Sequence, residues 1–330
     1  MTAFPRQKTF LDLFPAPEFL RLSNVGVVIS DEDIKFAELR REIFRSGFKL
    51  VHSGRVPIHQ GAIESGSINN TEELTSILKK LSLSHNTRFI MATLPEERAY
   101  LFTTSIDRVP AEGLRDAVAF IIEENVPVSL VESVFDFEII DEDANRSKIK
   151  LAVSVLPRSL VSSYIELFES AGITPISFDL ESQAIARAVI HRGDKRPHLI
   201  VNLSSKKTGF YVVEDEVVQF STTPAYGVGE DGSYPNLSDL KAEMRKVLAF
   251  WNARTDPSNL ERKIGKVILC GQGANKSDFV EKLMDGGGVK FALADVWLNI
   301  TPSRNHVPAI PFEKSLEYAS AIGLVLPNKR

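Results

Sequence analysis

Short apolar runs separated by polar turns recur along the chain, and three of them fall between residues 199 and 223. Each run is rich in β-branched and aromatic residues, so this stretch predicts three meandering strands. Residues 25–40 repeat the order of apolar strand, serine, polar turn and second strand. An offset of 174 residues (202 minus 28) places Val28 over Asn202, Ser30 over Ser204 and Phe36 over Phe210. The recurrence predicts an internal duplication with two similar lobes; chance is the competing explanation, because strand–turn–strand units are common.

The rest of the chain alternates predicted strands with predicted helices, which is the pattern of an α/β protein. Further strands are expected at residues 48–51, 88–94, 173–178, 266–269 and 289–293. Helices are expected at residues 67–81, 158–170, 238–254, 279–284 and 313–326, and another opens at Asp179. Asn70 or Thr71 is the expected cap of the first of these helices, because both side chains can accept a backbone hydrogen bond.

One part of the chain has a different order. Residues 99–106 are extended, a helix follows Pro110, and two strands at 134–140 and 148–156 flank a charged tip. We interpret this β-α-β-β unit as a small inserted subdomain. The predicted division is an N-terminal arm at 1–24, a first-lobe core at 25–98 and 171–197, the inserted subdomain at 99–170, and a second lobe at 198–330. The phenylalanine-rich arm either packs on the body or is a mobile tail.

Composition excludes several classes of function without adding a site. The 330 residues carry a net charge of −4, which gives no electrostatic footprint for nucleic acid. Cys270 is the only cysteine, as is typical of a reducing compartment. No apolar run approaches the roughly 18 residues that span a bilayer, and no signal peptide is recognisable. The six histidines are scattered, so no metal site is expected, and neither a nucleophile elbow nor a P-loop is present.

Five short motifs occur in a fixed order along the chain. They are FPAPEFLRLSNVGVVIS, IKFAEL from Ile34, IIEENVPVSLVESVFDFEII, DLESQAIARA from Asp179, and YASAIGL from Tyr318. Together they resemble the PilM family of type IV pilus assembly proteins, which is related to FtsA, and the resemblance covers most of the chain. It implies the actin-like ATPase fold: an α/β protein with two duplicated RNase H-like lobes and a small β-α-β-β subdomain inserted in the first.

The nucleotide motifs of that family are altered here. The family carries Asp-Ile-Gly in both hairpin turns, where the aspartates organise magnesium and the glycines admit the phosphates. This chain has Val28 and Ser30 in the first turn, and Asn202 and Ser204 in the second. Valine cannot ligate a metal, and a neutral amide is a poor substitute for a carboxylate. Residues 224–237 are also too few for the subdomain that walls the cleft, so we expect that subdomain to be reduced or absent.

The resemblance therefore implies a weakened nucleotide site with no catalytic residue, no metal ligand and at most weak binding of ATP with magnesium. The implied positions are Ser30, Asp31, Lys35, Asp179, Asn202, Ser204, Thr208, Gly271, Gly273 and Ala274. Plainer roles compete at several of them. Gly271 and Gly273 could simply close a tight turn, Lys35 could be a solvated strand residue, and Asp179 could favour a helix dipole.

The function that the resemblance implies is a non-catalytic cytoplasmic scaffold, held at the inner membrane by partners and not inserted itself. The expected partner is the cytoplasmic N-terminal peptide of a PilN-like inner-membrane protein; contacts with other pilus assembly proteins and self-association are left open. By analogy, the peptide groove would involve Phe102, Ile106, Leu114, Val118 and Ile121. Each of these residues could instead be core. Two alternatives stand beside the scaffold: an ATP-binding actin-like ATPase with an altered site, and a cytoplasmic component of a type II secretion system.

Overall fold

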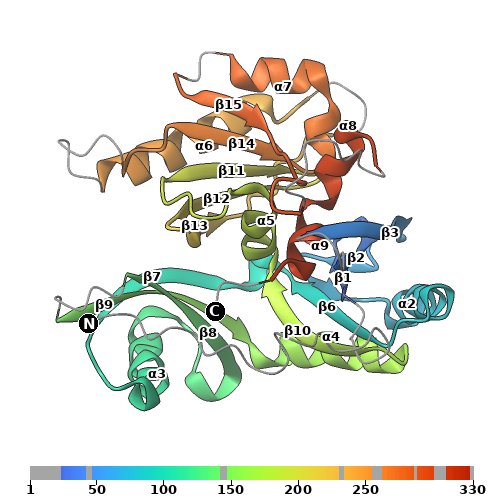
Figure 1. Cartoon of the computed structure of the whole chain (residues 1–330), viewed down its shortest axis with the longest axis horizontal. Coiled ribbons are helices and arrows are strands. Elements are labelled where there is room, and N and C mark those ends of the chain that lie inside the picture. The colour runs from blue at the N-terminus through green and yellow to red at the C-terminus, as the bar shows by residue number, and fades with distance from the viewer. Residues whose placement is uncertain are drawn as a thin grey trace.

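Two five-stranded sheets organise the computed structural model of the protein (Figure 1). The structure describes residues 24–41, 47–141, 147–229, 234–254, 262–285, 288–300 and 310–327. The strands of the first sheet are β1 (Asn24–Ile29), β2 (Asp33–Arg41), β3 (Phe48–Pro57), β6 (Phe89–Leu94) and β10 (Thr174–Leu180). Those of the second are β11 (His198–Leu203), β12 (Thr208–Glu214), β13 (Val217–Thr222), β14 (Lys266–Cys270) and β15 (Lys290–Leu293). The predicted arm at residues 1–24 lies outside the described residues, apart from the first residue of β1.

The two sheets have the same topology. Their strand orders are β10-β6-β1-β2-β3 and β15-β14-β11-β12-β13, and in each the central strand pairs antiparallel on one side and parallel on the other. The register agrees residue by residue, because Val27 lies opposite Phe36 and Val201 lies opposite Phe210. The predicted duplication is therefore confirmed.

Helices cover the outer faces of the sheets and fill the space between the lobes (Figure 1). On the first lobe, α2 (Thr71–His85) and α4 (Arg158–Ser170) contribute to the core beneath β1. On the second lobe, α6 (Leu237–Ala253) and α7 (Ser277–Met284) pack on the sheet. Two shorter helices, α5 (Glu181–Val189) and α9 (Ala319–Val325), lie between the lobes and join one continuous core with both.

Two helix predictions need correction. The helix expected at 67–81 begins at Thr71, where the Asn70 side chain accepts from the Glu73 amide; Ser67 and Ile68 instead form β5, which pairs with β4 (Ile63–Glu64). The helix expected at 313–326 is broken into α8 (Phe312–Ser315), a 3₁₀ turn (Leu316–Tyr318) and α9. The break occurs where the Leu316 carbonyl accepts a hydrogen bond from the Gly271 amide at 2.9 Å. That carbonyl bonds to the turn after β14 of the second lobe.

The inserted subdomain has the expected β-α-β-β order. It consists of β7 (Tyr100–Asp107), α3 (Leu114–Asn125), β8 (Ser133–Asp141) and β9 (Lys148–Pro157). The strand order β7-β9-β8 places β9 in the middle, and α3 packs on the sheet to form a separate core. Helix α4, assigned to this unit from the sequence, packs instead into the first-lobe core through Leu160, Tyr164 and Phe168. As a packed body the subdomain ends with β9.

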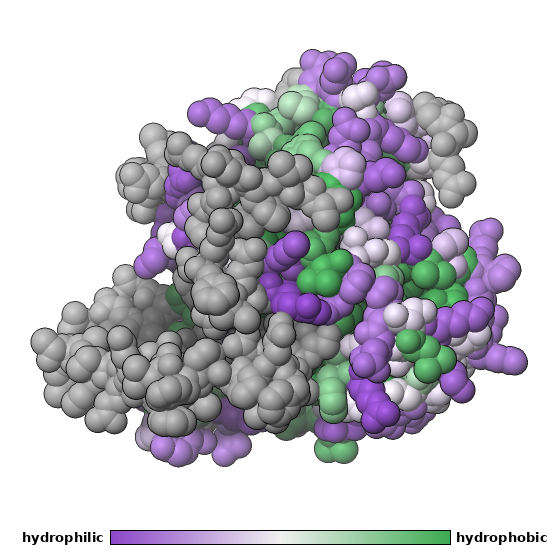
Figure 2. All heavy atoms as spheres, turned by 45° about the vertical axis from the view of Figure 1, so that its right-hand side comes forward, coloured by the Kyte–Doolittle hydropathy of each residue, from purple (hydrophilic) through white to green (hydrophobic). Residues whose placement is uncertain are grey.

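The described part of the second lobe consists of its sheet, its helices and the turns that join them. Between β13 and α6, the described residues 223–229 and 234–236 form no helix or strand. In the part of the surface that Figure 2 colours by hydropathy, hydrophilic residues surround separate apolar patches. None of the helices in the described ranges is long and apolar enough to cross a membrane.

Candidate functional site

The turns of the two duplicated hairpins meet where the lobes join. Each turn is closed by its serine in the same way: the Ser30 amide donates to the Asp33 carbonyl at 2.9 Å, and the Ser204 amide donates to the Lys207 carbonyl at 3.1 Å. Both serine hydroxyls donate to those same carbonyls, at 3.1 and 2.7 Å. Neither serine has a positive φ. The serines that replace the family's glycines are therefore compatible with the turn and add a hydrogen bond to it.

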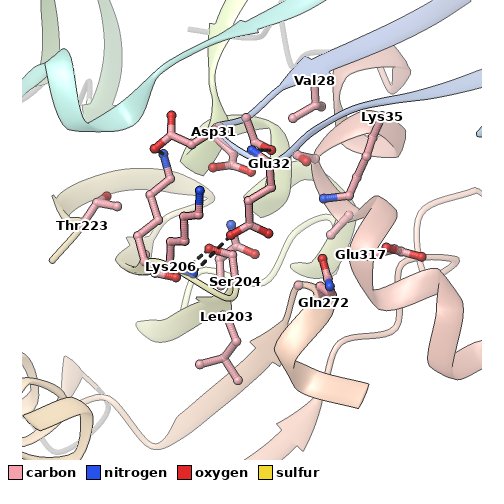
Figure 3. A pocket seen from close by; sticks show the side chains of 18 of the residues that line it. Val28, Asp31, Glu32, Lys35, Leu203, Ser204, Lys206, Thr223, Gln272 and Glu317 are labelled. Atoms are coloured by element: carbon pink, nitrogen blue, oxygen red, sulfur yellow. Dashed lines mark hydrogen bonds and ion pairs between the residues drawn. The ribbon is translucent and has the colours of Figure 1, made fainter. Parts of the chain in front are cut away.

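The two turns carry opposite charges and bind each other. The Glu32 Oε1 atom accepts a hydrogen bond from the Ser205 hydroxyl at 2.5 Å and another from the Lys206 amide at 3.1 Å. Figure 3 shows the Glu32 side chain extending from the first turn toward the second. The Lys207 Nζ atom lies 3.6 Å from Asp31 and 2.6 Å from Glu97, both of the first lobe. Contacts within the chain thus bridge the two lobes.

Behind the turns lies a partly exposed acid at the start of α5, Glu181. The surrounding protein raises the pKa of Glu181, chiefly by burial, while Lys207 and Lys35 act to lower it. Burial acts most strongly to lower the pKa of Lys207, but Glu97, Asp31 and Glu181 together hold that pKa above its usual value. The Asn202 side chain acts to lower the pKa of both Glu181 and Tyr211 by hydrogen bonding. The polar groups beneath the turns are therefore partnered by one another.

Little space remains between the turns. The cavity that they line has a volume of only about 40 Å³, room for a few water molecules. Pockets that enclose small-molecule ligands have roughly 300–1,000 Å³. Val28, at the position of the family's first aspartate, is 3% exposed and packs in the core that joins the lobes. The residues present do not fit a magnesium-bound nucleotide in this arrangement.

Six of the ten residues predicted for the nucleotide site line this cavity: Ser30, Asp31, Lys35, Asn202, Ser204 and Gly271. The other four lie elsewhere. Thr208 is buried and donates to the Tyr226 carbonyl, and Asp179 is paired with Arg187. Gly273 lines a neighbouring cavity of about 250 Å³, and Ala274 is buried in the second-lobe core.

The backbone conformation and close packing at position 271 require glycine. Its φ is +85°, and a Cβ there would lie 2.4 Å from the Leu203 carbonyl oxygen. The position therefore requires glycine for a left-handed conformation and for close contact with β11. This is the tight-turn role considered for it from the sequence.

The sequence reasoning missed most of the groups that bridge the lobes. Glu32, Glu97, Lys206, Lys207 and Tyr211 were not selected. A signal was present for three of them: the aligned turns read Ser-Asp-Glu-Asp at residues 30–33 and Ser-Ser-Lys-Lys at residues 204–207. Acidic and basic residues at matching positions of a duplicated turn indicate that the two turns attract each other.

The five residues predicted to bind a partner form part of the subdomain core. Ile106 and Val118 are buried, and Phe102, Leu114 and Ile121 pack against them. Phe102 and Ile106 lie on one face of β7, and apolar residues recur at every third or fourth position of α3. A buried core and a peptide groove both require this pattern, so the sequence does not distinguish them. None of the five lines either the interlobe cavity or the larger groove described next.

The larger groove lies where the subdomain, α5 and the second lobe meet. Its volume is about 690 Å³. One wall is β8, residues 136–140, and the opposite wall is the β12–β13 turn, residues 215–218. Helix α5 contributes Ala186 and Arg187, and Ile190 directly follows its last residue. In the described part of the chain β8 pairs only with β9, so its other edge has no strand partner, and five consecutive residues of β8 line the groove.

The sequence pattern of the family described as "Type IV pilus assembly protein PilM" matches residues 26–231. The chain belongs to the PilM family. The match includes the first lobe, the inserted subdomain and the second hairpin, that is, both turns of the interlobe cavity. No curated protein sequence matches the chain.

Solved structures place this PilM-family chain in the actin-like fold. A "PilM-PilN type IV pilus biogenesis complex" is 17% identical, with coverage of 92% of this chain and 98% of that chain and a TM-score of 0.78. The ethanolamine utilization protein EutJ from Carboxydothermus hydrogenoformans is 12% identical, with coverage of 94% and 90% and a TM-score of 0.50. The cytoplasmic domain of EpsL, from the type II secretion system of Vibrio cholerae, is 11% identical, with coverage of 90% and 94% and a TM-score of 0.46. In the described residues, no group of three or more histidines, cysteines and carboxylates could hold a metal ion.

Proposed function

We propose that this protein is a non-catalytic cytoplasmic scaffold of type IV pilus assembly. It holds the cytoplasmic N-terminal peptide of a PilN-like inner-membrane protein, and through that partner it is peripheral to the membrane. Its lobes stay together without nucleotide. The observation that carries the proposal is the pair of cavities: about 40 Å³ between the turns and about 690 Å³ beside β8. The groove therefore offers far more space for a ligand than the gap between the two turns, and more than the cavity of about 250 Å³ beside Gly273.

The groove suits an extended peptide. An edge strand offers main-chain hydrogen bonds to a segment that lies alongside it, and neighbouring side chains provide specificity. The walls combine apolar residues such as Ile139 and Val217 with charges of both signs, including Arg192 and Asp215. An unpaired edge of this kind is otherwise a risk for aggregation. The neighbouring structure in which a PilM protein is found with PilN supports the choice of partner.

Among the charged residues that line the groove, Glu138 is placed to favour a basic or amide group of a bound peptide. Burial raises the pKa of Glu138, and the nearby Arg187 lowers it while Asp179 raises it. Arg187 is already bonded to Asp179 and to the Gly323 carbonyl. Glu138 therefore has no cation of its own in the described structure, and a basic or amide group of the bound peptide would be stabilised there.

The test measures binding of a synthetic peptide, the N-terminal cytoplasmic segment of the cognate PilN-like protein. Ile139 is 40% exposed on β8, so Ile139→Asp should fold normally and weaken binding at least about tenfold, since one apolar anchor contributes about 1.5–3 kcal/mol. Ile176→Asp is the matched control: Ile176 is 41% exposed but lies on β10, outside the groove.

Thermal unfolding is recorded for both variants, so that a folding defect is separated from a binding defect. Equal peptide affinities of the native protein and of folded Ile139→Asp would contradict the assignment of the groove. Failure of the native protein to bind the peptide would contradict the assignment of the partner.

A further inference from the structure

The contact between Glu32 and the second hairpin turn has the form of a bound anion. One carboxylate oxygen, Oε1, receives both the Ser205 hydroxyl at 2.5 Å and the Lys206 amide at 3.1 Å. The donors belong to the other lobe, 173 and 174 residues away in the sequence. A backbone amide and a hydroxyl that converge on one oxygen are the groups that proteins use to hold oxyanions.

The receiving turn is preformed and rigid. The Ser204 carbonyl accepts from the Val228 amide at 2.9 Å, and the Ser205 carbonyl accepts from the Gly229 amide at 3.1 Å. With both carbonyls bound from behind, the Lys206 amide faces the first lobe. Lys206 adds positive charge to the same turn, whereas the charge of Lys207 is already paired with Asp31 and Glu97. The turn would attract an anion whether or not that anion belonged to the chain.

The turn that donates the carboxylate is equally fixed. The Ser30 hydroxyl accepts from the Glu32 and Asp33 amides at 3.3 and 3.1 Å, and the Glu32 carbonyl accepts from the Ile58 amide at 3.1 Å. The Glu32 backbone is thus held from two sides, and its side chain extends across the junction as Figure 3 shows. Little backbone entropy therefore remains to be lost when the contact forms, and the cost that is left is the rotamer freedom of the Glu32 side chain.

We propose that Glu32 is a built-in anion ligand of the 204–207 turn. Its carboxylate occupies the place of an external oxyanion and fastens the two lobes together. The position that corresponds to Glu32 in the second turn is Lys206, 174 residues later. The duplicated turn has therefore become two complementary halves, one that supplies the anion and one that receives it.

The proposal predicts that removal of the carboxylate uncovers an anion site. In buffer free of phosphate and sulfate, Glu32→Ala should unfold about 2–5 °C below the native protein, the shift expected for loss of a charged hydrogen-bonded contact. Inorganic phosphate at millimolar concentration should restore part of that loss. Potassium chloride at equal ionic strength should not, and the native protein should gain no more from phosphate than from the chloride.

Three further variants make the result specific. Ser205→Ala should be destabilised alone but should add little to Glu32→Ala, because both remove one contact. Glu32→Gln, which folds with an acceptor oxygen in the same place, should show no rescue by phosphate, because the amide still fills the turn. Glu64→Ala removes an exposed glutamate of the same lobe and should change neither stability nor phosphate response.

Two results would overturn the proposal. One is an equal response of the native protein and Glu32→Ala to phosphate, which would mean that Glu32 does not occupy the site. The other is additive destabilisation by Glu32→Ala and Ser205→Ala with no rescue of either. The probe is phosphate without nucleotide or peptide, so neither result depends on the proposed partner groove.

Discussion

Val28 and Asn202 occupy the same position in the two duplicated hairpins. Val28 lies opposite Lys35 in the first hairpin, and Asn202 lies opposite Gly209 in the second. Each residue of the second pair comes 174 positions after its counterpart in the first. Val28 is buried in the core between the lobes, and the Asn202 side chain acts to lower the pKa of Glu181 and of Tyr211. Neither residue offers a carboxylate to a cation, and hard cations such as Mg²⁺ are bound through oxygen ligands that are usually charged.

The first prediction concerns ATP. We expect no binding of ATP with magnesium tighter than about millimolar, which is about −4 kcal/mol, and no hydrolysis above background. The reasons are the 40 Å³ cavity and the absence of carboxylates at Val28 and Asn202. Isothermal titration, with an ATP-binding protein of known affinity measured alongside, checks the expectation. A micromolar dissociation constant, or ATP that copurifies with the protein, would show it to be wrong.

A second prediction separates the subdomain core from the peptide groove. Ile106 is 6% exposed in the core between β7 and α3, so Ile106→Ala should cost about 2–5 kcal/mol of stability. Protein that remains folded should bind the peptide with unchanged affinity, because Ile106 lies outside the groove. Phe120→Ala is the control in the same subdomain: Phe120 lies on α3 and is 70% exposed, and its loss should change stability by under about 0.5 kcal/mol. Weakened binding by folded Ile106→Ala would return the partner site to this core.

The elements that could be predicted from the sequence are those with a local signal. Alternating apolar residues and polar turns located both hairpins, and the repeated serine revealed their relationship. The order of the inserted subdomain was predictable for the same reason. The assignment of α4 to that subdomain failed, because an apolar stripe shows that a helix packs but not which sheet it packs on.

The polar contacts between the lobes could not be predicted from the sequence. Contacts such as Glu32 with Ser205 join residues 173 positions apart, and no local pattern marks a glutamate as bound or solvated. The predicted partner residues pack in the subdomain core, and their role in binding stays a prediction, because apolar positions on β7 and α3 look alike in sequence whether a core or a peptide covers them. The groove is lined partly by polar residues such as Glu138 and Arg187, which carry no helical or strand periodicity.

A third prediction addresses the crossing of α5 and α9 between the lobes. A Cβ at Gly323 would lie 1.7 Å from the Ala184 carbonyl oxygen, so the two helices pack backbone to backbone. Gly323→Ala should force them apart and cost at least about 2 kcal/mol, measured by chemical denaturation. Gly113→Ala is the matched control, because a Cβ there meets nothing within 4 Å. Equal stability of the two variants would show that the crossing can relax without cost.

The last prediction concerns pH and a carboxyl group at the junction of three elements. Glu96 is 4% exposed; its Oε2 accepts from the Ser182 amide at 3.1 Å and its Oε1 from the Ser182 hydroxyl at 2.9 Å. Burial raises the pKa of Glu96 to about 7, although the hydrogen bonds from Ser182 and Ser221 oppose the rise. Ser182 lies in the first turn of α5 and Ser221 lies on β13 of the second lobe, so the Glu96 carboxyl group links both lobes.

Because its folded-state pKa is above the value of about 4.5 in the unfolded chain, Glu96 binds its proton more tightly in the folded protein. Its contribution to stability is therefore fully present below pH 4.5 and is lost as the pH rises to about 7, a change of at most about 3 kcal/mol. Glu96→Gln mimics the protonated form and should remove this slope. Urea unfolding from pH 4.5 to 8, with Glu64→Gln as the exposed control, measures it; parallel pH profiles for the native protein and Glu96→Gln would refute the assignment.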